Sequence, residues 1–191
     1  MDAIILAGGE NRRFHSHKGL AEINGRKIIE TTTELLKKHF SAVYISTNEP
    51  ELFFYLGLPM IGDIVDRRGP MSGIYSALIS TEAPELFVAA CDMPFIRDEV
   101  VELIVKRYHG QAALLPVFQG RPQPLLGIYS QGIASAMEER IRHDRKALWD
   151  LLGEKRVEYI GEDEVMEADP EGRSFVNINT LEEYRKLTDH S

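Results

Sequence analysis

Short, mostly apolar runs alternate with helix-like segments along the first half of the chain. The runs cover residues 3–7, 43–47, 58–61 and 86–90. Runs of this length without polar alternation are typical of strands that are buried on both faces of a parallel sheet. Between them, apolar residues recur at helical spacing, as at Ile28, Leu35 and Leu36. Strands that alternate with helices form a mostly parallel sheet with helices on both faces, so the pattern predicts an α/β fold.

The same patterns place further elements along the chain. We expect helices at 28–40, 49–56, from 69 onward, 99–108, 131–142 and 146–152, and strands at 112–117, 125–129 and 157–160. The acidic residues 161–173 predict a surface loop or a weak helix, and residues 174–178 a strand. Residues 180–183 form a capping box, which indicates the start of a last helix.

The loops that follow the early strands are the candidates for chemistry. Sheets of this class bind ligands at the carboxyl ends of their strands. We therefore expect the site in the loops after Ala7, Thr47, Ile61 and Ala90.

Composition limits the partners. No linker interrupts the 191 residues, which predicts a single domain, 1–191. The chain has 22 Lys and Arg residues against 30 Asp and Glu residues, a formal net charge of −8. Nucleic acids and anionic membranes attract clustered positive charge, so neither is an expected partner. An anionic ligand must therefore be small and held by a local group of cations.

The cysteine content and the N-terminus indicate the compartment. Cys91 is the only cysteine, which excludes an internal disulfide and fits a reducing cytosol. The first apolar run follows an acid and is too short for a signal peptide. No apolar run approaches the roughly 20 residues of a membrane span. We therefore expect a cytoplasmic protein.

Two glycines follow the first strand directly. Gly8 and Gly9 allow the backbone to fold closely round an anion and to present N–H groups to it. Arg12, Arg13 and Lys18 follow shortly after and can neutralise phosphate oxygens. The segment is neither a Walker P-loop, because no Ser or Thr follows the lysine, nor a GxGxxG loop. A turn with solvated basic residues is the alternative interpretation.

The glycine loop resembles a known signature. Residues 6–18 match Leu-Ala-Gly-Gly-x(3)-Arg-x(4)-Lys of the nucleotidyltransferase superfamily, with Arg13 and Lys18 at the two basic positions. More closely, the chain resembles the molybdenum cofactor guanylyltransferase family. Later landmarks follow in that family's order: Asp63, Gly-Pro-Met-Ser-Gly-Ile at 69–74, Cys-Asp-Met-Pro at 91–94, Pro122 and Pro124, and Val-Asn-Ile-Asn-Thr at 176–180. The resemblance therefore covers nearly the whole chain.

The resemblance implies a three-layer α/β/α, Rossmann-like nucleotidyltransferase fold with a mostly parallel sheet. Residues 1–95 would form the nucleotide-binding part and residues 96–191 the acceptor-binding part. The backbone positions that contact the guanine nucleotide in the family correspond to Leu6, Ala7 and Gly8. Gly9 would leave room for the triphosphate. Asp63 corresponds to an aspartate that contacts the nucleotide, and Asp66 is the alternative for that role.

The catalytic roles implied by the resemblance fall on three charged residues. Lys18 and Arg13 would neutralise the phosphates, and Asp92 would bind Mg²⁺, which prefers hard oxygen ligands. A helix cap or a partner for Arg13 is the alternative role for Asp92. Asn177 and Asn179 lie in a segment that edges the active site in the family, so a polar contact there is expected.

Some residues depart from the family pattern or add to it. Phe14, His15 and His17 stand where the family usually has Met, Gly and often Asp. Two histidines without a third nearby ligand are interpreted as loop residues rather than as a zinc site. A basic run is interpreted as a solvated helix surface, with acceptor binding as the alternative; it consists of Arg140, Arg142, Arg145 and Lys146.

The resemblance implies transfer of GMP from GTP to the terminal phosphate of molybdopterin, with release of pyrophosphate. A phosphate monoester has its second pKa near 6, so the acceptor is largely dianionic at neutral pH and needs no general base. The alternatives are a cytidylyltransferase, a transferase for sugar or polyol phosphates, and a non-catalytic nucleotide-binding regulator. Transient docking to molybdoenzyme apoproteins is the expected protein contact.

Overall fold

The computed structural model describes residues 1–8, 18–65, 69–145, 147–151, 153–154 and 156–178, apart from the side chain of Lys18. The predicted capping box at 180–183 lies outside these residues. No helix in the described part of the chain has the length and hydrophobicity of a membrane span.

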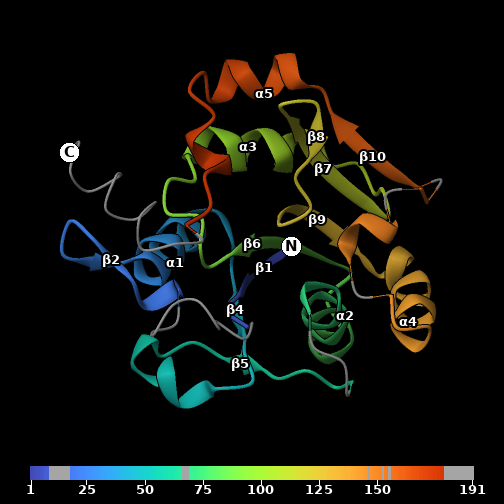
Figure 1. Cartoon of the computed structure of the whole chain (residues 1–191), viewed down its shortest axis with the longest axis horizontal. Helices are drawn as coiled ribbons and strands as arrows, with labels where there is room; N and C mark the ends of the chain where they lie inside the picture. Colours follow the sequence, from blue (N-terminus) through green and yellow to red (C-terminus); the bar gives the residue numbers. More distant parts are fainter. Residues whose placement is uncertain (9–17, 66–68, 146, 152, 155, 179–191) are drawn as a thin grey trace.

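A mixed, mostly parallel sheet forms the centre of the molecule (Figure 1). Its strand order is β10-β7-β9-β6-β1-β4-β5. The bounds are β1 Asp2–Leu6, β4 Val43–Ser46, β5 Met60–Ile61, β6 Glu85–Ala90, β7 Ala113–Phe118, β9 Leu126–Ser130 and β10 Val157–Ile160. Strands β6, β1, β4 and β5 are parallel, as are β7 and β10, whereas β9 runs antiparallel to both of its neighbours. The short strand β8 (Arg121–Pro122) pairs with β7.

Helices cover both faces of the sheet (Figure 1). One face packs against α1 (Ile28–His39), α3 (Asp98–Arg107) and α5 (Glu162–Ala168). The other packs against α2 (Pro70–Thr81) and α4 (Ala134–Arg142). This arrangement confirms the predicted three-layer α/β/α fold.

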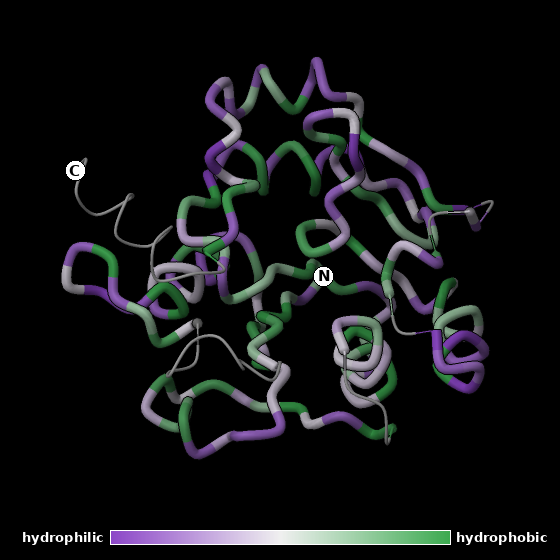
Figure 2. Tube along the Cα trace, in the orientation of Figure 1, coloured by the Kyte–Doolittle hydropathy of each residue, from purple (hydrophilic) through white to green (hydrophobic). Residues whose placement is uncertain are grey.

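Strand β1 is buried on both faces, which explains why polar and apolar residues do not alternate in its sequence. Ile5 packs with the α1 and α3 layer and Ile4 with the α2 and α4 layer, and both side chains are fully buried. The strand lies between β4 and β6, so both of its edges are also paired. Figure 2 shows the hydrophobic centre of the sheet and the hydrophilic outer turns of α4. A strand buried in this way requires apolar residues throughout.

A β-hairpin connects the glycine loop region to α1. Its strands are β2 (Glu22–Ile23) and β3 (Arg26–Lys27). The predicted turn at Asn24 and Gly25 is confirmed, because both residues have positive φ angles of 52° and 76°. Positive φ at both central residues is what a two-residue hairpin turn requires.

Three predicted helices are shorter or more broken than expected. Residues 49–56 form two 3₁₀ turns, η2 (Pro50–Leu52) and η3 (Phe54–Leu56), because Phe53 between them turns its side chain fully into the core. Residues 131–142 begin with the 3₁₀ turn η4 (Gln131–Ile133) before α4. Within 146–152 the structure describes only the 3₁₀ turn η5, Leu148–Leu151.

The prediction of a strand at 174–178 was wrong. The chain instead forms a 3₁₀ turn, η6 (Arg173–Phe175). The preceding residues 161–173, for which the sequence allows a surface loop or a weak helix, contain the short helix α5. The fully buried carboxylate of Asp169 accepts a hydrogen bond from the backbone N–H of Ser174 at 2.7 Å. The hydroxyl of Ser174 in turn accepts one from the N–H of Arg97 at 3.0 Å. These local bonds fold the segment into a turn that the apolar pattern does not reveal.

Candidate active site

Four loops meet at one edge of the sheet. The parallel strands β6, β1, β4 and β5 are neighbours, so the residues that follow them lie at the same edge. Ala7 and Gly8 after β1, Asp63 after β5 and Asp92 after β6 were singled out from the sequence, and Asn48 after β4 joins them in the structure. The structure thus brings together the described residues that the sequence singled out, at the edge where α/β sheets bind ligands.

The loop after β1 presents backbone rather than side chains. Leu6 and Ala7 are buried, and the N–H of Ala7 donates to Ser46 O at 2.9 Å. Gly8 is exposed, and a Cβ there would meet no described atom within 4 Å. A ligand at this loop can therefore reach the peptide groups closely. The predicted sites Gly9 and Arg13 lie outside the described residues.

Packing brings Lys18 into the neighbourhood of Asp92. Lys18 begins the 3₁₀ turn η1, Lys18–Leu20. The next residue, Gly19, lies against Cys91, because a Cβ at Gly19 would stand 3.1 Å from the Cβ of Cys91 and 3.2 Å from its Sγ. Only a glycine fits at this distance without a shift, so the fold places the backbone of Lys18 beside the loop that carries Asp92.

Asp92 lies between two segments far apart in sequence. It is half-buried, and its backbone carbonyl accepts a hydrogen bond from the N–H of Ile178 at 3.0 Å. Asn177 is therefore held next to this loop, as the family resemblance implied. The Oδ1 atom of Asn177 is shielded from solvent and accepts no hydrogen bond from the described residues.

The donor atoms at this place fit Mg²⁺. A carboxylate and an amide oxygen are hard ligands, and Mg²⁺ is commonly held by one or two carboxylates together with substrate phosphates and water. Among the described residues, no group of three or more His, Cys, Asp and Glu side chains could hold a metal ion alone.

Asp63 is held by a residue that the sequence reasoning missed. The Nδ2 of Asn48 donates to Oδ2 of Asp63 at 2.9 Å, and the N–H of Asp63 donates to Oδ1 of Asn48 at 2.8 Å. Beside them, the N–H of Ile64 donates to the buried hydroxyl of Ser76 at 2.9 Å. The turn is thus fixed by side chains from two other elements. Asp66, the alternative to Asp63, lies outside the described residues.

The start of α2 approaches the same edge. A Cβ at Gly73 would stand 2.8 Å from Oγ of Ser46 and 3.4 Å from Cδ2 of Leu6. The absence of a side chain there lets the first turns of α2 pack onto the ends of β1 and β4. Pro70, at the first helical position, needs no hydrogen-bond acceptor for its nitrogen. The N-terminus of a helix of this length favours anions.

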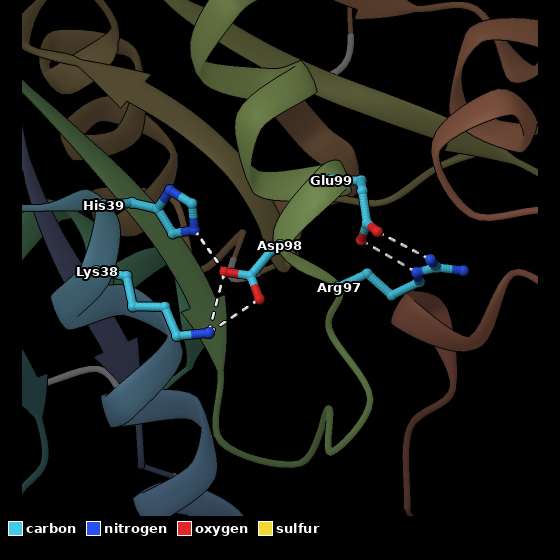
Figure 3. A network of polar contacts seen from close by, with 5 residues as sticks. All are labelled: Lys38, His39, Arg97, Asp98 and Glu99. Atoms are coloured by element: carbon cyan, nitrogen blue, oxygen red, sulfur yellow. Dashed lines mark hydrogen bonds and ion pairs between the residues drawn. The ribbon is translucent and has the colours of Figure 1, made fainter.

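A separate charged cluster joins the end of α1 to the start of α3 (Figure 3). Nε2 of His39 lies 2.8 Å from Oδ1 of Asp98, and Nζ of Lys38 donates to Oδ2 of Asp98 at 3.0 Å. These hydrogen bonds from His39 and Lys38 lower the pKa of Asp98. None of the three residues directly follows one of the strands β1, β4, β5 and β6, whose carboxyl ends form the edge with the candidate site, here called the active edge. We therefore interpret the cluster as a brace between two helices.

Comparison with known proteins identifies the family. Residues 3–159 match the model of the MobA-like NTP transferase domain. The chain belongs to the MobA-like NTP transferase family. A probable molybdenum cofactor guanylyltransferase of Peptoclostridium acidaminophilum is 32% identical, covering 97% of this chain and 87% of that protein.

A second relative and a solved structure support the same family assignment. The molybdenum cofactor guanylyltransferase of Desulfosudis oleivorans is 31% identical over 97% of this chain and 95% of its own length. In structure, the molybdopterin-guanine dinucleotide biosynthesis protein A of Archaeoglobus fulgidus superposes with a TM-score of 0.85 at 27% identity. That alignment covers 100% of this chain and 98% of the other. The fold and the family expected from the sequence are thereby confirmed.

Proposed function

We propose that this protein is a molybdenum cofactor guanylyltransferase, which transfers GMP from GTP to the terminal phosphate of molybdopterin and releases pyrophosphate. The observation that carries the proposal is the near full-length similarity to proteins named for this activity. The arrangement of Gly8, Asp63 and Asp92 along one sheet edge supports it, because a nucleotide laid across that edge would contact all three loops.

The proposed roles follow from the position and chemistry of each group. The exposed peptide groups at Gly8 would contact the nucleotide, and the Asp63 carboxylate would accept hydrogen bonds from it. Lys18 and Arg13 would neutralise charge on the triphosphate. Nucleotidyl transfer depends mainly on positioning and on electrostatic stabilisation of the phosphates, so no protein nucleophile is needed.

Mg²⁺ would be held by the carboxylate of Asp92 with substrate phosphates, and Asn177 offers a further oxygen. When bound, the ion would add positive charge against the phosphates undergoing transfer. The acceptor phosphate, already largely dianionic at neutral pH, would attack the α-phosphorus. The dinucleotide formed in this reaction is a labile cofactor, so we also propose that the protein docks transiently to molybdoenzyme apoproteins.

The test is the choice of nucleotide. The purified protein is incubated with molybdopterin, Mg²⁺ and each NTP in turn, and pyrophosphate release is measured together with the dinucleotide product. We expect release with GTP and a guanine dinucleotide as product. Turnover with CTP alone would contradict the proposal and favour a cytidylyltransferase. GTP binding by calorimetry without turnover on molybdopterin or any sugar phosphate would favour a nucleotide-binding regulator.

A further inference from the structure

Asp169 is the only buried charged residue among those that the structure describes. It directly follows α5 and has none of its surface exposed to solvent. Its Oδ2 accepts a hydrogen bond from the N–H of Ser174 at 2.7 Å. Its Oδ1 is also shielded from solvent and accepts no hydrogen bond from the described residues. The sequence assigned no role to this carboxylate.

The cation beside this carboxylate is a weak partner. Nη1 of Arg97 lies 4.0 Å from Oδ1 of Asp169, which is beyond hydrogen-bond distance. The guanidinium donates instead to the carboxylate of Glu99, at 3.0 and 3.2 Å (Figure 3). Burying a carboxylate with one described hydrogen bond and a distant counter-ion costs stability. The benefit of Asp169 therefore lies in what it holds in place.

Asp169 begins a tight turn that is packed on the sheet. Its carbonyl accepts a hydrogen bond from the N–H of Gly172 at 3.0 Å. Gly172 has a positive φ of 64° and lies against the ring of Phe118 in β7. Phe175 stacks on the same ring, with the two centroids 4.8 Å apart. The turn is therefore fixed to β7 and to the end of α5, which defines the position of Ser174 within it.

The residues after this turn run beside the loop between β6 and α3. At one end, the hydroxyl of Ser174 accepts a hydrogen bond from the N–H of Arg97 at 3.0 Å. At the other end, the N–H of Ile178 donates to the carbonyl of Asp92 at 3.0 Å. Ser174 thus bonds to the end of the loop and Ile178 to its start, so the two segments are antiparallel and joined at both ends. This pairing carries Asn177 to Asp92.

We infer that Asp169 is a positioning residue for the metal site, which acts through Ser174 to hold Asn177 and the loop of Asp92 where they bind Mg²⁺ with the nucleotide. The inference rests on the proposed function and adds to it a residue remote from the glycine loop. The amide oxygen of Asn177 takes no hydrogen bond from the described residues, so its position depends on the backbone that carries it. Groups that orient metal ligands strengthen metal binding without touching the ion.

Calorimetry of nucleotide binding tests this role without turnover. The affinity for a non-hydrolysable GTP analogue is measured with Mg²⁺ and with EDTA, and the ratio of the two dissociation constants gives the gain in affinity due to the metal. In Asp169→Ala we expect this gain to fall about tenfold or to vanish, as for the loss of a group that orients a metal ligand, while the affinity in EDTA stays within about twofold. Asp169→Asn keeps an oxygen that can accept from Ser174 and should recover most of the gain.

Ser174→Ala is a milder variant that decides the question even if Asp169→Ala does not fold. It removes only the hydroxyl that bonds to Arg97, and it should reduce the gain from Mg²⁺ about fivefold, the effect of one net hydrogen bond. Ser130→Ala is the matched control, because Ser130 is also buried and its hydroxyl also accepts from a backbone N–H, that of Gly132 at 3.2 Å. Ser130 pairs with Glu85 at the opposite end of β6, so its loss should leave the gain unchanged. Thermal unfolding shows whether each variant is folded.

The outcomes separate this inference from the proposed function. An unchanged gain from Mg²⁺ in the folded variants, with a normal guanine dinucleotide product from the wild type, would overturn the inference and leave the function standing. Equal losses of affinity with Mg²⁺ and with EDTA would also overturn it, because Asp169 would then support the nucleotide site as a whole rather than the metal. Absence of product from the wild-type protein with GTP, molybdopterin and Mg²⁺ would contradict the function itself, whatever the calorimetry shows.

Discussion

Asn48 and Asp63 form the best-defined polar pair at the active edge. Each residue gives the other one hydrogen bond, and both follow strands that are neighbours in the sheet. The amide thus fixes the orientation of the carboxylate before any ligand binds. Such pre-orientation is what a carboxylate needs to select hydrogen-bond donors on a nucleotide. We therefore propose that Asn48 positions the carboxylate of Asp63 and takes no direct part in the transfer.

Replacing Asn48 should weaken nucleotide binding without stopping transfer. Loss of two hydrogen bonds to Asp63 in Asn48→Ala should raise the KM for GTP about tenfold, since one hydrogen bond is worth about 1 kcal/mol, and leave kcat within about threefold. Gln111→Ala, which removes a half-buried amide with hydrogen bonds to Arg107 and Glu158, is the control. A large fall in kcat with an unchanged KM would contradict the positioning role.

Asp92 and Lys18 should behave differently from Asn48. If they stabilise charge during transfer, Asp92→Ala and Lys18→Ala should each lower kcat by about 100-fold or more, by analogy with the removal of single electrostatic donors. Circular dichroism and thermal unfolding check that each variant is folded. Near-normal turnover in either folded variant would remove that residue from the catalytic machinery.

At the scale of elements, α2 depends on one close approach. The helix packs against the ends of β1 and β4 because Gly73 has no side chain. The sequence predicted a helix starting at Gly69 and Pro70, and the structure confirms it. The packing partner of Gly73 could not be predicted, because a contact with Ser46 depends on where a distant strand lies in the sheet.

Gly73→Ala should destabilise the protein although alanine is the better helix former. A Cβ 2.8 Å from Oγ of Ser46 forces a shift, and overpacking of this kind costs about 1–3 kcal/mol. Urea unfolding measures the loss. The double variant Gly73→Ala with Ser46→Ala should regain part of it, whereas Gly153→Ala, where a Cβ meets no described atom within 4 Å, should change little. Equal stability of Gly73→Ala and the wild type would contradict the packing argument.

The brace between α1 and α3 makes stability depend on pH. The pKa of Asp98 is lower in the folded chain because His39 and Lys38 bond to its ionised form. Its contribution is therefore complete above the pKa of the unfolded state, about 3.9, and is lost as pH falls through the lower folded value. Because the carboxylate is 44% exposed, solvent screening keeps the effect small, about 0.5 kcal/mol.

Asp98→Asn tests this dependence. At pH 7 the variant should unfold at a lower urea concentration than the wild type, and the difference should shrink as the pH is lowered toward 3 in matched titrations. Glu99→Gln, which breaks the neighbouring pair with Arg97 but leaves the brace intact, is the control. A difference that persists unchanged at the lowest pH would contradict an electrostatic origin.

At the scale of the whole molecule, hydrophobic patterning was sufficient for the central layers. Runs such as 86–90 are buried on both faces of the sheet, so their sequence alone indicates their place. The strand predicted at 174–178 was wrong because the buried carboxylate of Asp169 and the hydroxyl of Ser174, rather than the apolar residues, determine the path of this segment. Turns held by specific side chains carry little periodic signal.

In the candidate site, too, residues next to apolar strands could be predicted from the sequence, whereas contacts between distant segments could not. Asp63 and Asp92 were predicted as site residues because they lie just after apolar strands and match a family signature. Asn48, Ser76 and the packing of Gly19 on Cys91 could not, because they depend on three-dimensional neighbours.

A crystal structure of the protein with Mg²⁺ and a non-hydrolysable GTP analogue tests the central claim most directly. We expect the nucleotide to lie across the loops of β1, β4 and β5, with an oxygen of Asp92 bound to the ion at about 2.0–2.1 Å, the usual Mg²⁺–oxygen distance. A nucleotide bound at another edge of the sheet, or a metal ion that Asp92 does not contact, would contradict it.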